Sequence, residues 1–355
     1  MASATETDQG YKTLMQVAWE FDYHIGNERI HNLYERAKEQ QWNVTTDINW
    51  AQGVDPSRPI LEGEGFGFSH MPLFQRLSKS QQERFRAHTA AHRLSQFLHG
   101  EQGALMTAAT LSHSVPDYEA KLYSSTQTMD EARHVEVFQK YVDKIAIVYP
   151  ISPLLKSLID ATLRSDHWIK IAIGMNVVIE GLAMGAFYNM SRVSGCKQLS
   201  DIVELTMRDE ARHVAFGNVY VGQALANMHP DDREDAADFA LFALSAMAPS
   251  MDRGGDVRSG SSRRDPTFVA VLENCGIAVE DFAKGIEEAR EAGISLEPKG
   301  GTINILRDLV MPALSRIGAV TDRTRAILKE RNIVLNEDTR ILESLEDAKT
   351  GIVNL

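Results

Sequence analysis

One five-residue string occurs twice in this chain, and each copy follows an isolated glutamate at the same distance. The string Asp-Glu-Ala-Arg-His occupies 130–134 and 209–213, and Glu101 and Glu180 each lie 30 residues before the glutamate of the next copy. At a rise of 1.5 Å per residue, ~13 residues down one helix and ~13 up the next bring two such positions level. The spacing therefore predicts two antiparallel helix pairs with their glutamates facing one another.

These side chains have the chemistry of a two-metal site. In a helix, residues i and i+3 share a face, so the glutamate and histidine of each copy can point at one ion together. Carboxylates can bridge two ions, and imidazole suits iron. Buried glutamates without a cation would each cost several kcal/mol, whereas two divalent ions would balance four of them. A four-helix bundle holds dimetal sites with this arrangement of ligands. The predicted metal ligands are Glu101, Glu131, His134, Glu180, Glu210 and His213.

Residues beside these ligands predict a second layer of contacts. Asp130 and Asp209 directly precede the ligand glutamates. We expect a crossed arrangement, in which each aspartate accepts a hydrogen bond from the ring N–H of the histidine in the other copy. Metal-bound imidazoles usually need such a partner to fix their tautomer. Arg133 and Arg212 are placed to neutralise the two aspartates.

One helical turn from the ligands, the same helix faces carry mostly apolar residues. Phe138 and Met184 are expected beside the metals, where they would line a pocket for substrate. Thr206 is the only hydroxyl residue that stands four residues, about one turn, before a ligand glutamate, so it is placed to deliver protons. Alternatively, the first two residues only pack the core, and the threonine bonds a backbone carbonyl of its own helix.

Composition restricts the function further. The chain has 355 residues, of which 43% are hydrophobic, and a net charge of −12, which argues against a nucleic-acid partner. Two cysteines, Cys196 and Cys275, form no disulfide framework or Cys-rich metal module. The polar, acidic N-terminus lacks signal-peptide character, so we expect a cytoplasmic protein. The most apolar stretch, 168–190, carries Lys170 and Glu180, which favours a core helix over a membrane span.

The patterning along the chain predicts three regions. They are N-terminal helices and wrapping loops at 1–79, a dimetal bundle at 80–230 and a C-terminal helical extension packed on it at 231–355. The bundle helices are expected at about 80–114, 115–149, 166–193 and 197–228. Smaller features are one or two helices within 11–41, loops over 42–77, a basic Gly/Ser-rich linker at 253–264 and a break around 298–302.

The doubled Asp-Glu-x-Arg-His string with its matched glutamates resembles the ferritin-like superfamily of dimetal carboxylate proteins. The similar branch contains the ribonucleotide reductase small subunit, bacterial monooxygenase hydroxylases, arylamine N-oxygenases and reductase-related ligand-binding oxidases. This resemblance implies an all-α, ferritin-like four-helix bundle elaborated with additional N- and C-terminal helices. The string 40–48 is similar to the reductase segment that places a tryptophan beside an Asp–His pair. Trp42, Asp209 and His134 would then form an electron path, or Trp42 would only plug the outer bundle.

The chain departs from each subgroup. Phe138 stands where the reductase subunit usually keeps its radical tyrosine, and Ala104 and Met175 stand at the crosslink positions of the ligand-binding oxidases. Met184 replaces a threonine of the monooxygenases. Thr206 stands where arylamine N-oxygenases add a histidine, so six protein ligands are expected rather than seven.

The resemblance implies a dioxygen-activating, non-haem di-iron oxidoreductase, an oxygenase or hydroxylase of a small organic substrate. Its cofactor would be two iron ions cycling between Fe(II) and Fe(III), with manganese an alternative at one or both positions. The chain shows no flavin, haem or iron–sulfur motif, so an external electron donor or reductase is expected, together with assembly as a homodimer. The alternatives are a reductase-like, radical-generating protein and a ferritin-like iron oxidase.

Overall fold

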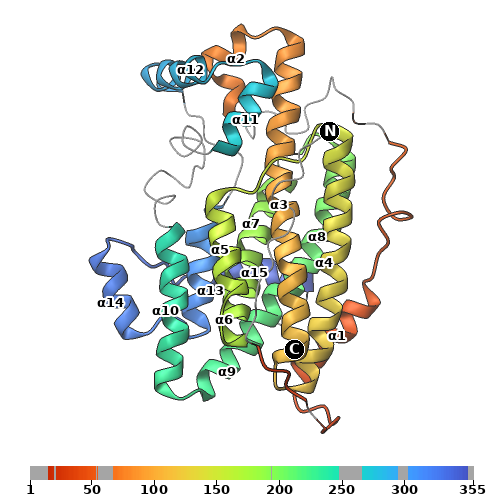
Figure 1. Cartoon of the computed structure of the whole chain (residues 1–355), viewed down its shortest axis with the longest axis vertical. Coiled ribbons are helices and arrows are strands. Elements are labelled where there is room, and N and C mark those ends of the chain that lie inside the picture. Colours follow the sequence, from red (N-terminus) through yellow and green to blue (C-terminus); the bar gives the residue numbers. More distant parts are fainter. Residues whose placement is uncertain are drawn as a thin grey trace.

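The regular structure of the described residues is helical throughout, as the all-α prediction requires (Figure 1). The structure is a computed structural model, and it describes residues 15–19, 21–52, 54, 67–192, 194–247, 266–294 and 303–350. The predicted linker at 253–264 and the break at 298–302 lie outside these residues.

Four long, upright helical rods form the centre of the molecule (Figure 1). The first two are α3 (Lys79–Ser114) and α4 (Tyr118–Ile145), which pack along most of their length. The third consists of α6 (Trp168–Ala172), η3 (Ile173–Ile179) and α7 (Glu180–Ser191). The fourth consists of α8 (Lys197–Phe216), η4 (Gly217–Val221) and α9 (Gly222–Asn227). These bounds lie close to the ranges expected from the sequence.

The start of α3 follows directly from its sequence. The Ser78 hydroxyl accepts a hydrogen bond from the Gln81 amide at 3.4 Å, and the Gln81 side chain accepts one from the Ser78 amide at 3.1 Å. This reciprocal capping box satisfies two backbone donors that would otherwise lack partners at a helix start. The rod therefore begins at Lys79, close to the start at about 80 that was expected from the sequence.

Two segments of π-helix interrupt the third and fourth rods, and neither was predicted from the sequence. One, η3, ends directly before Glu180; the other, η4, begins four residues after His213. A π-segment inserts one extra residue into a helical turn and is frequently found at functional sites. The two segments contact one another, and Gly217 of η4 lies against Asn176 of η3.

The prediction of helix across 11–41 was wrong for its first part. Among the described residues only α1 (Glu28–Glu39) is helical there, and the chain before it is extended. Val17, Trp19, Phe21 and Tyr23 occur at every second position, a spacing that suits an extended chain rather than a helix face. These four side chains are 65–75% exposed.

The remaining helices enclose the rods. Around the upper end of α3 in Figure 1 lie α2 (Pro72–Arg76), α11 (Pro266–Cys275) and α12 (Val279–Glu291). The lower part is covered by α5 (Pro153–Leu163), α10 (Pro230–Met247), η6 (Leu306–Val310), α13 (Met311–Arg316), α14 (Asp322–Glu330) and α15 (Arg340–Thr350). Both hydrophobic clusters of the core combine rod residues with residues from outside 80–230.

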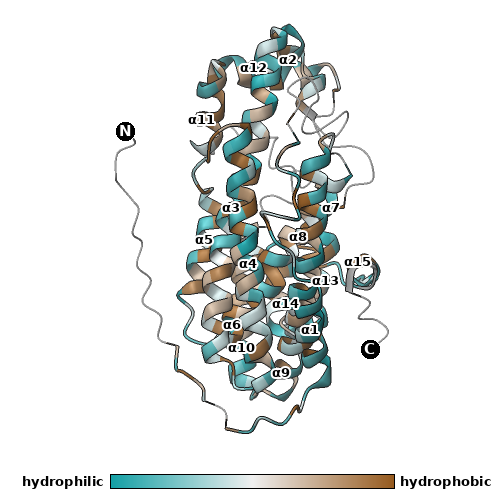
Figure 2. Ribbon diagram, turned by 90° about the vertical axis from the view of Figure 1, so that its right-hand side faces the viewer, coloured by the Kyte–Doolittle hydropathy of each residue, from teal (hydrophilic) through white to brown (hydrophobic). Residues whose placement is uncertain are grey.

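One helical stretch has the length and composition to cross a membrane. It is Trp168–Ser191, with 24 residues, and 78% of its most apolar window is buried inside the protein. Figure 2 shows hydrophobic stretches near α6 and α7 and a hydrophilic α1. Burial on this scale identifies the stretch as a core helix, as expected.

Replacing Gly217 with alanine should destabilise the fold, because the new Cβ would lie 2.8 Å from Cβ of Asn176 and 2.9 Å from its carbonyl oxygen. Overpacking of this kind costs about 1–3 kcal/mol. Nothing lies within 4 Å of a Cβ added at Gly100, so Gly100→Ala should instead stabilise by up to ~1 kcal/mol through helix propensity. Urea unfolding of the metal-free variants measures both changes in the free energy of unfolding. Changes of the same sign and size in the two variants would contradict the close packing at Gly217.

Candidate metal centre

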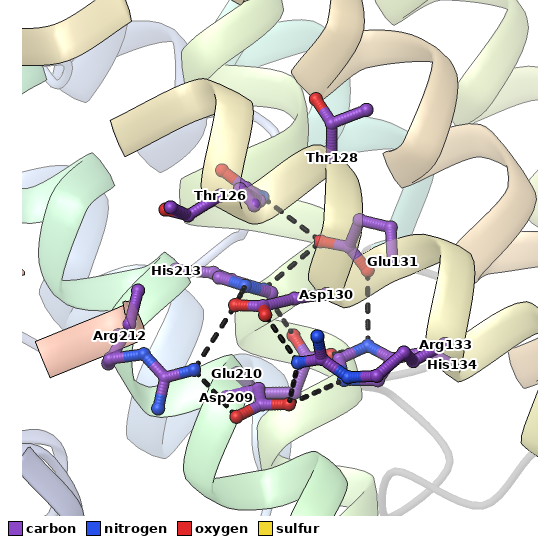
Figure 3. Close-up of polar contacts among 12 residues, drawn as sticks. Thr126, Thr128, Asp130, Glu131, Arg133, His134, Asp209, Glu210, Arg212 and His213 are labelled. Atoms are coloured by element: carbon purple, nitrogen blue, oxygen red, sulfur yellow. Dashed lines mark hydrogen bonds and ion pairs between the residues drawn. The ribbon is translucent and has the colours of Figure 1, made fainter. Parts of the chain in front are cut away.

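The six predicted ligand side chains converge at one level in the middle of the bundle. Each rod supplies a glutamate there, and the second and fourth rods add the two histidines. All six side chains are at most 4% exposed. Figure 3 shows that the acidic and imidazole groups of the two repeated strings point toward each other between α4 and α8.

The donor atoms fall into two groups that share one residue. Potential ligand atoms of the first group lie within 4.8 Å of one another; they come from Glu101, Glu131, His134 and Glu210. The same limit encloses those of the second group, from Glu131, Glu180 and His213. Two neighbouring groups with a common carboxylate are the arrangement that a bridged pair of ions requires.

Both central carboxylates span the two groups. Glu131 directs Oε2 toward Nδ1 of His134 at 3.2 Å and Oε1 toward Nδ1 of His213 at 3.1 Å. Glu210 also faces both histidines: its Oε1 lies 3.1 Å from Nδ1 of His134, and its Oε2 lies 3.5 Å from Nδ1 of His213. Ligands ~2.1 Å from an ion in an octahedral shell lie ~3 Å apart, so these separations suit an ion between the atoms.

The outer carboxylates each belong to one group. Oε2 of Glu101 lies 3.2 Å from Nδ1 of His134, and Oε2 of Glu180 lies 3.8 Å from Nδ1 of His213. The structure thus places one terminal glutamate and one histidine at each position, with two carboxylates between the positions.

We call the six side chains of Glu101, Glu131, His134, Glu180, Glu210 and His213 the cage. Several donor atoms of this cage have no hydrogen-bond partner although they are buried. They include both carboxylate oxygens of Glu210 and Nδ1 of His213. Buried polar atoms normally find a partner, and a buried carboxylate without one is costly. Divalent ions bonded to these atoms would remove that cost, so the residues present fit a pair of metal ions.

The pKa values of the four carboxylates divide into two pairs. Burial, reinforced by Glu210, holds the pKa of Glu101 well above its ordinary value, and burial together with Glu131 does the same for the pKa of Glu180. Burial also opposes ionisation of Glu131, but the charge of His213 outweighs this effect and lowers the pKa of Glu131 well below its ordinary value. The pKa of Glu210 is lowered despite burial, because the neighbouring side chains of Glu180, His134 and His213 favour its ionised form.

The environment also shifts the pKa values of the two imidazoles. Burial opposes their protonation, but Glu101 raises the pKa of His134 well above its ordinary value, and Glu131 does so for the pKa of His213.

The other ring nitrogen of each histidine points at an aspartate of the opposite string. Nε2 of His134 lies 3.2 Å from Oδ2 of Asp209, and Nε2 of His213 lies 3.3 Å from Oδ2 of Asp130. These are the crossed contacts expected from the sequence. Each leaves Nδ1 directed into the cage, since the N–H is donated to the carboxylate.

Two arginines tie these aspartates together. Nη2 of Arg212 donates to Asp209 at 2.6 Å and to Asp130 at 3.1 Å, and Nη2 of Arg133 donates to both aspartates as well, with the longer contact at 3.2 Å (Figure 3). The four charges sum to zero. Charge-assisted hydrogen bonds of this kind are the strong ones, so the aspartates that orient the imidazoles are themselves held in place.

The segment after α1 covers this network. Nε1 of Trp42 donates to Oδ2 of Asp209 at 2.7 Å, and its ring lies 6.4 Å from that of His134 at an interplanar angle of 25°. Gln40 accepts from Arg212 at 2.6 Å, and Gln41 donates to Asp130 at 3.1 Å. The two glutamines were not predicted as site residues, although they stand next to Trp42 in the string that carried its resemblance.

A comparison with protein families identifies this arrangement. A family model described as P-aminobenzoate N-oxygenase AurF matches residues 26–253, which include the extended segment at Trp42 and all six cage side chains. The chain belongs to the AurF family. The prediction of a ferritin-like di-iron protein is thereby confirmed, and the chain is an oxygen-using oxidoreductase that acts on O₂ and a small molecule.

Solved structures with a similar course of the chain are R2-like ligand-binding oxidases. One, with an aerobically reconstituted metal cofactor after photoconversion, has 15% identity and a TM-score of 0.46, with 84% of this chain and 99% of that chain covered. Another, with a Mn/Fe cofactor after a long soak, has 15% identity, a TM-score of 0.42 and coverages of 79% and 96%. No curated protein matches this chain.

The three predicted pocket residues lie in the core of this AurF-family protein. Phe138 is fully buried and its ring is stacked on that of Phe187, with centroids 5.5 Å apart. Met184 is 1% exposed. Thr206 is fully buried, but its hydroxyl makes no hydrogen bond, so the expected alternative of a bond to its own helix is wrong.

Metal loading should release protons, because ligands must be deprotonated and the pKa values of the outer glutamates and of both histidines are raised in the metal-free protein. Apparent affinity should accordingly rise with pH. Anaerobic Fe(II) titration in weakly buffered solution with a pH indicator measures the release, and binding of two ions without protons would contradict the charge assignment.

Proposed function

We propose that this protein is a di-iron oxygenase that transfers one oxygen atom of O₂ to a small organic substrate, with an amine nitrogen as the favoured acceptor. The observation that carries the proposal is the pair of donor groups joined by Glu131, within the span matched by the AurF family. The balanced reaction is R–NH₂ + O₂ + 2e⁻ + 2H⁺ → R–NHOH + H₂O. Two iron ions held by the six cage side chains would supply the redox chemistry with O₂.

The residues of the chain would orient and isolate this chemistry. The crossed aspartates fix the imidazole tautomers, and the arginines fix the aspartates. Such supports tune a metal site nearly as strongly as its direct ligands. An enclosed cage excludes bulk water, which strengthens the electrostatic interactions inside.

An aromatic layer one turn from the cage is the proposed substrate side. Phe97 lies four residues before Glu101 on α3, and Phe138 lies four residues after His134 on antiparallel α4, so both stand on the same side of the cage. The ring of Phe187 contacts both, with centroids 4.6 and 5.5 Å away. We assign this layer, with the adjacent Met184, to the binding of a planar apolar substrate.

Thr206 is the proposed proton donor of this side. It lies one turn before Glu210 on α8, and its hydroxyl is buried without a partner. A buried hydroxyl without a partner costs free energy, which a hydrogen bond to a bound solvent molecule or substrate would recover.

Trp42 is the proposed entry point for electrons from an external donor or reductase. Its indole donates to Asp209, which accepts from His134, so three hydrogen-bonded groups connect the outside of α4 and α8 to one ligand. The indole is 6% exposed, close enough to the surface for a docked donor.

Aerobic turnover with iron, a chemical reductant and a panel of small aromatic amines should give hydroxylamine or further oxidised products that carry ¹⁸O from ¹⁸O₂. The matched variant Trp42→Phe should keep its iron and its peroxide-driven activity but lose roughly tenfold or more of the reductant-driven rate, the size typical of a lost partner beside a ligand. Mass spectrometry of the products and stopped-flow reduction measure both.

Oxygen uptake that is never coupled to an oxygenated product would contradict the oxygenase. A persistent organic radical in the electron resonance spectrum would favour the radical-generating alternative, and rapid Fe(II) oxidation without substrate would favour the iron oxidase. If Trp42→Phe lost the reductant-driven and the peroxide-driven rates equally, the electron route through Trp42 would be contradicted.

We also propose that the protein works in the cytoplasm as a homodimer. Met106 on α3 and Met129 on α4 are 54% and 55% exposed, and we place them at the contact between the two copies. Light scattering should give about twice the chain mass of 39.5 kDa; the mass of a single chain would contradict the dimer.

A further inference from the structure

A buried pair of side-chain amides lies against one side of the cage. Gln127 stands on α4 one turn before Glu131 and is fully buried. Its Nε2 donates to Oε1 of Glu131 and to Oε1 of Glu180, each at 3.1 Å. Nδ2 of Asn176 in turn donates to Oε1 of Gln127 at 2.9 Å.

The orientation of these amides follows from their partners. Carboxylates that bind a metal ion are ionised and only accept hydrogen bonds, so Gln127 turns its NH₂ group toward the two glutamates, which commits both amide hydrogens. Its carbonyl then needs a donor, and Asn176 supplies one. Inside a protein, where the effective dielectric constant is low, such connected bonds strengthen one another, and a missing member is expensive.

The backbone is shaped to bring Asn176 to this place. Asn176 lies in the middle of η3, and Gly217 begins η4 opposite it. A Cβ at Gly217 would lie 2.9 Å from the carbonyl oxygen of Asn176. The two π-segments therefore approach more closely than any residue with a side chain would allow at Gly217.

The amides support only one of the two metal positions directly. Gln127 bonds Glu180, the terminal carboxylate beside His213, and the shared Glu131. In the described part of the chain, the hydrogen bond recorded for the opposite terminal carboxylate, Glu101, is with His134 itself. The neighbouring Gly100 has open space where a Cβ would lie.

We propose that Gln127, held by Asn176, is a positioning residue that fixes Glu131 and Glu180 and makes the two metal positions unequal. The position at Glu180 and His213 is firmly held, and the position at Glu101 and His134 is free to adjust its coordination. This inference rests on the proposed di-iron function, and it assigns the adjustable position as the one at which O₂ and substrate gain access.

The test compares Gln127→Met, which keeps the side-chain length but removes the amide, with the wild type and with Gln102→Met. Gln102 is an exposed glutamine next to Glu101 on α3, so the control makes the same chemical change outside the cage. Anaerobic binding of Fe(II) alone is measured by competition with a chelator, and ⁵⁷Fe Mössbauer spectra of the loaded proteins report each ion separately.

Gln127→Met should weaken the binding of one of the two Fe(II) ions by about 10–100-fold, the usual effect of losing a hydrogen-bond partner of a metal ligand. It should also shift one of the two Fe(II) quadrupole doublets. The control should match the wild type. Asn176→Ala, which leaves Gln127 present but unsupported, should give a smaller change at the same doublet, and it provides the test if Gln127→Met does not fold.

Equal weakening of both ions, or two unchanged doublets in a folded variant, would overturn the inference. A wild-type protein that binds no iron would instead refute the proposed function. Because both readouts are taken without turnover, the two failures are distinguishable.

Discussion

The fold depends on bringing four carboxylates together in a space from which water is excluded. Glu131 and Glu210 are fully buried, and Glu101 and Glu180 almost so. Their mutual repulsion is what a pair of divalent ions would relieve, and it contributes to the raised pKa values of Glu101 and Glu180. Metal binding and proton release are thus two sides of one constraint, and the bundle has to be rigid enough to enforce it.

Rigidity comes from a layered set of charged contacts outside the cage. Each histidine is held by an aspartate from the opposite string, and each aspartate by both arginines. This arrangement nearly repeats on exchange of α4 and α8, as the duplicated string implies. The symmetry is broken at the edges, where the indole of Trp42 bonds one aspartate and Gln41 the other. We propose that these different surroundings give electrons and substrate separate routes to the two similar halves.

The bundle, the cage and the crossed aspartates could be predicted because they depend on local spacing. An i, i+3 pair on a helix and a matched interval of 30 residues leave little freedom for the side chains. The π-segments could not be predicted, since inserting one residue into a turn depends on the tertiary contact between Asn176 and Gly217 rather than on composition. The role of Gln127 could not be predicted either, because it depends on a hydrogen bond from Asn176 on a separate rod. The chain at 15–19 and 21–27 is not helical, although helix was expected within 11–41; its alternating apolar residues, Val17, Trp19, Phe21 and Tyr23, suit an extended chain instead.

The most direct test of this account is a crystal structure of the iron-loaded protein with anomalous diffraction recorded at the iron edge. The account predicts two peaks about 3.5–4 Å apart, with Glu131 and Glu210 between them, His134 bound to one and His213 to the other through Nδ1. A single peak, or two peaks outside the ring of these six side chains, would contradict it.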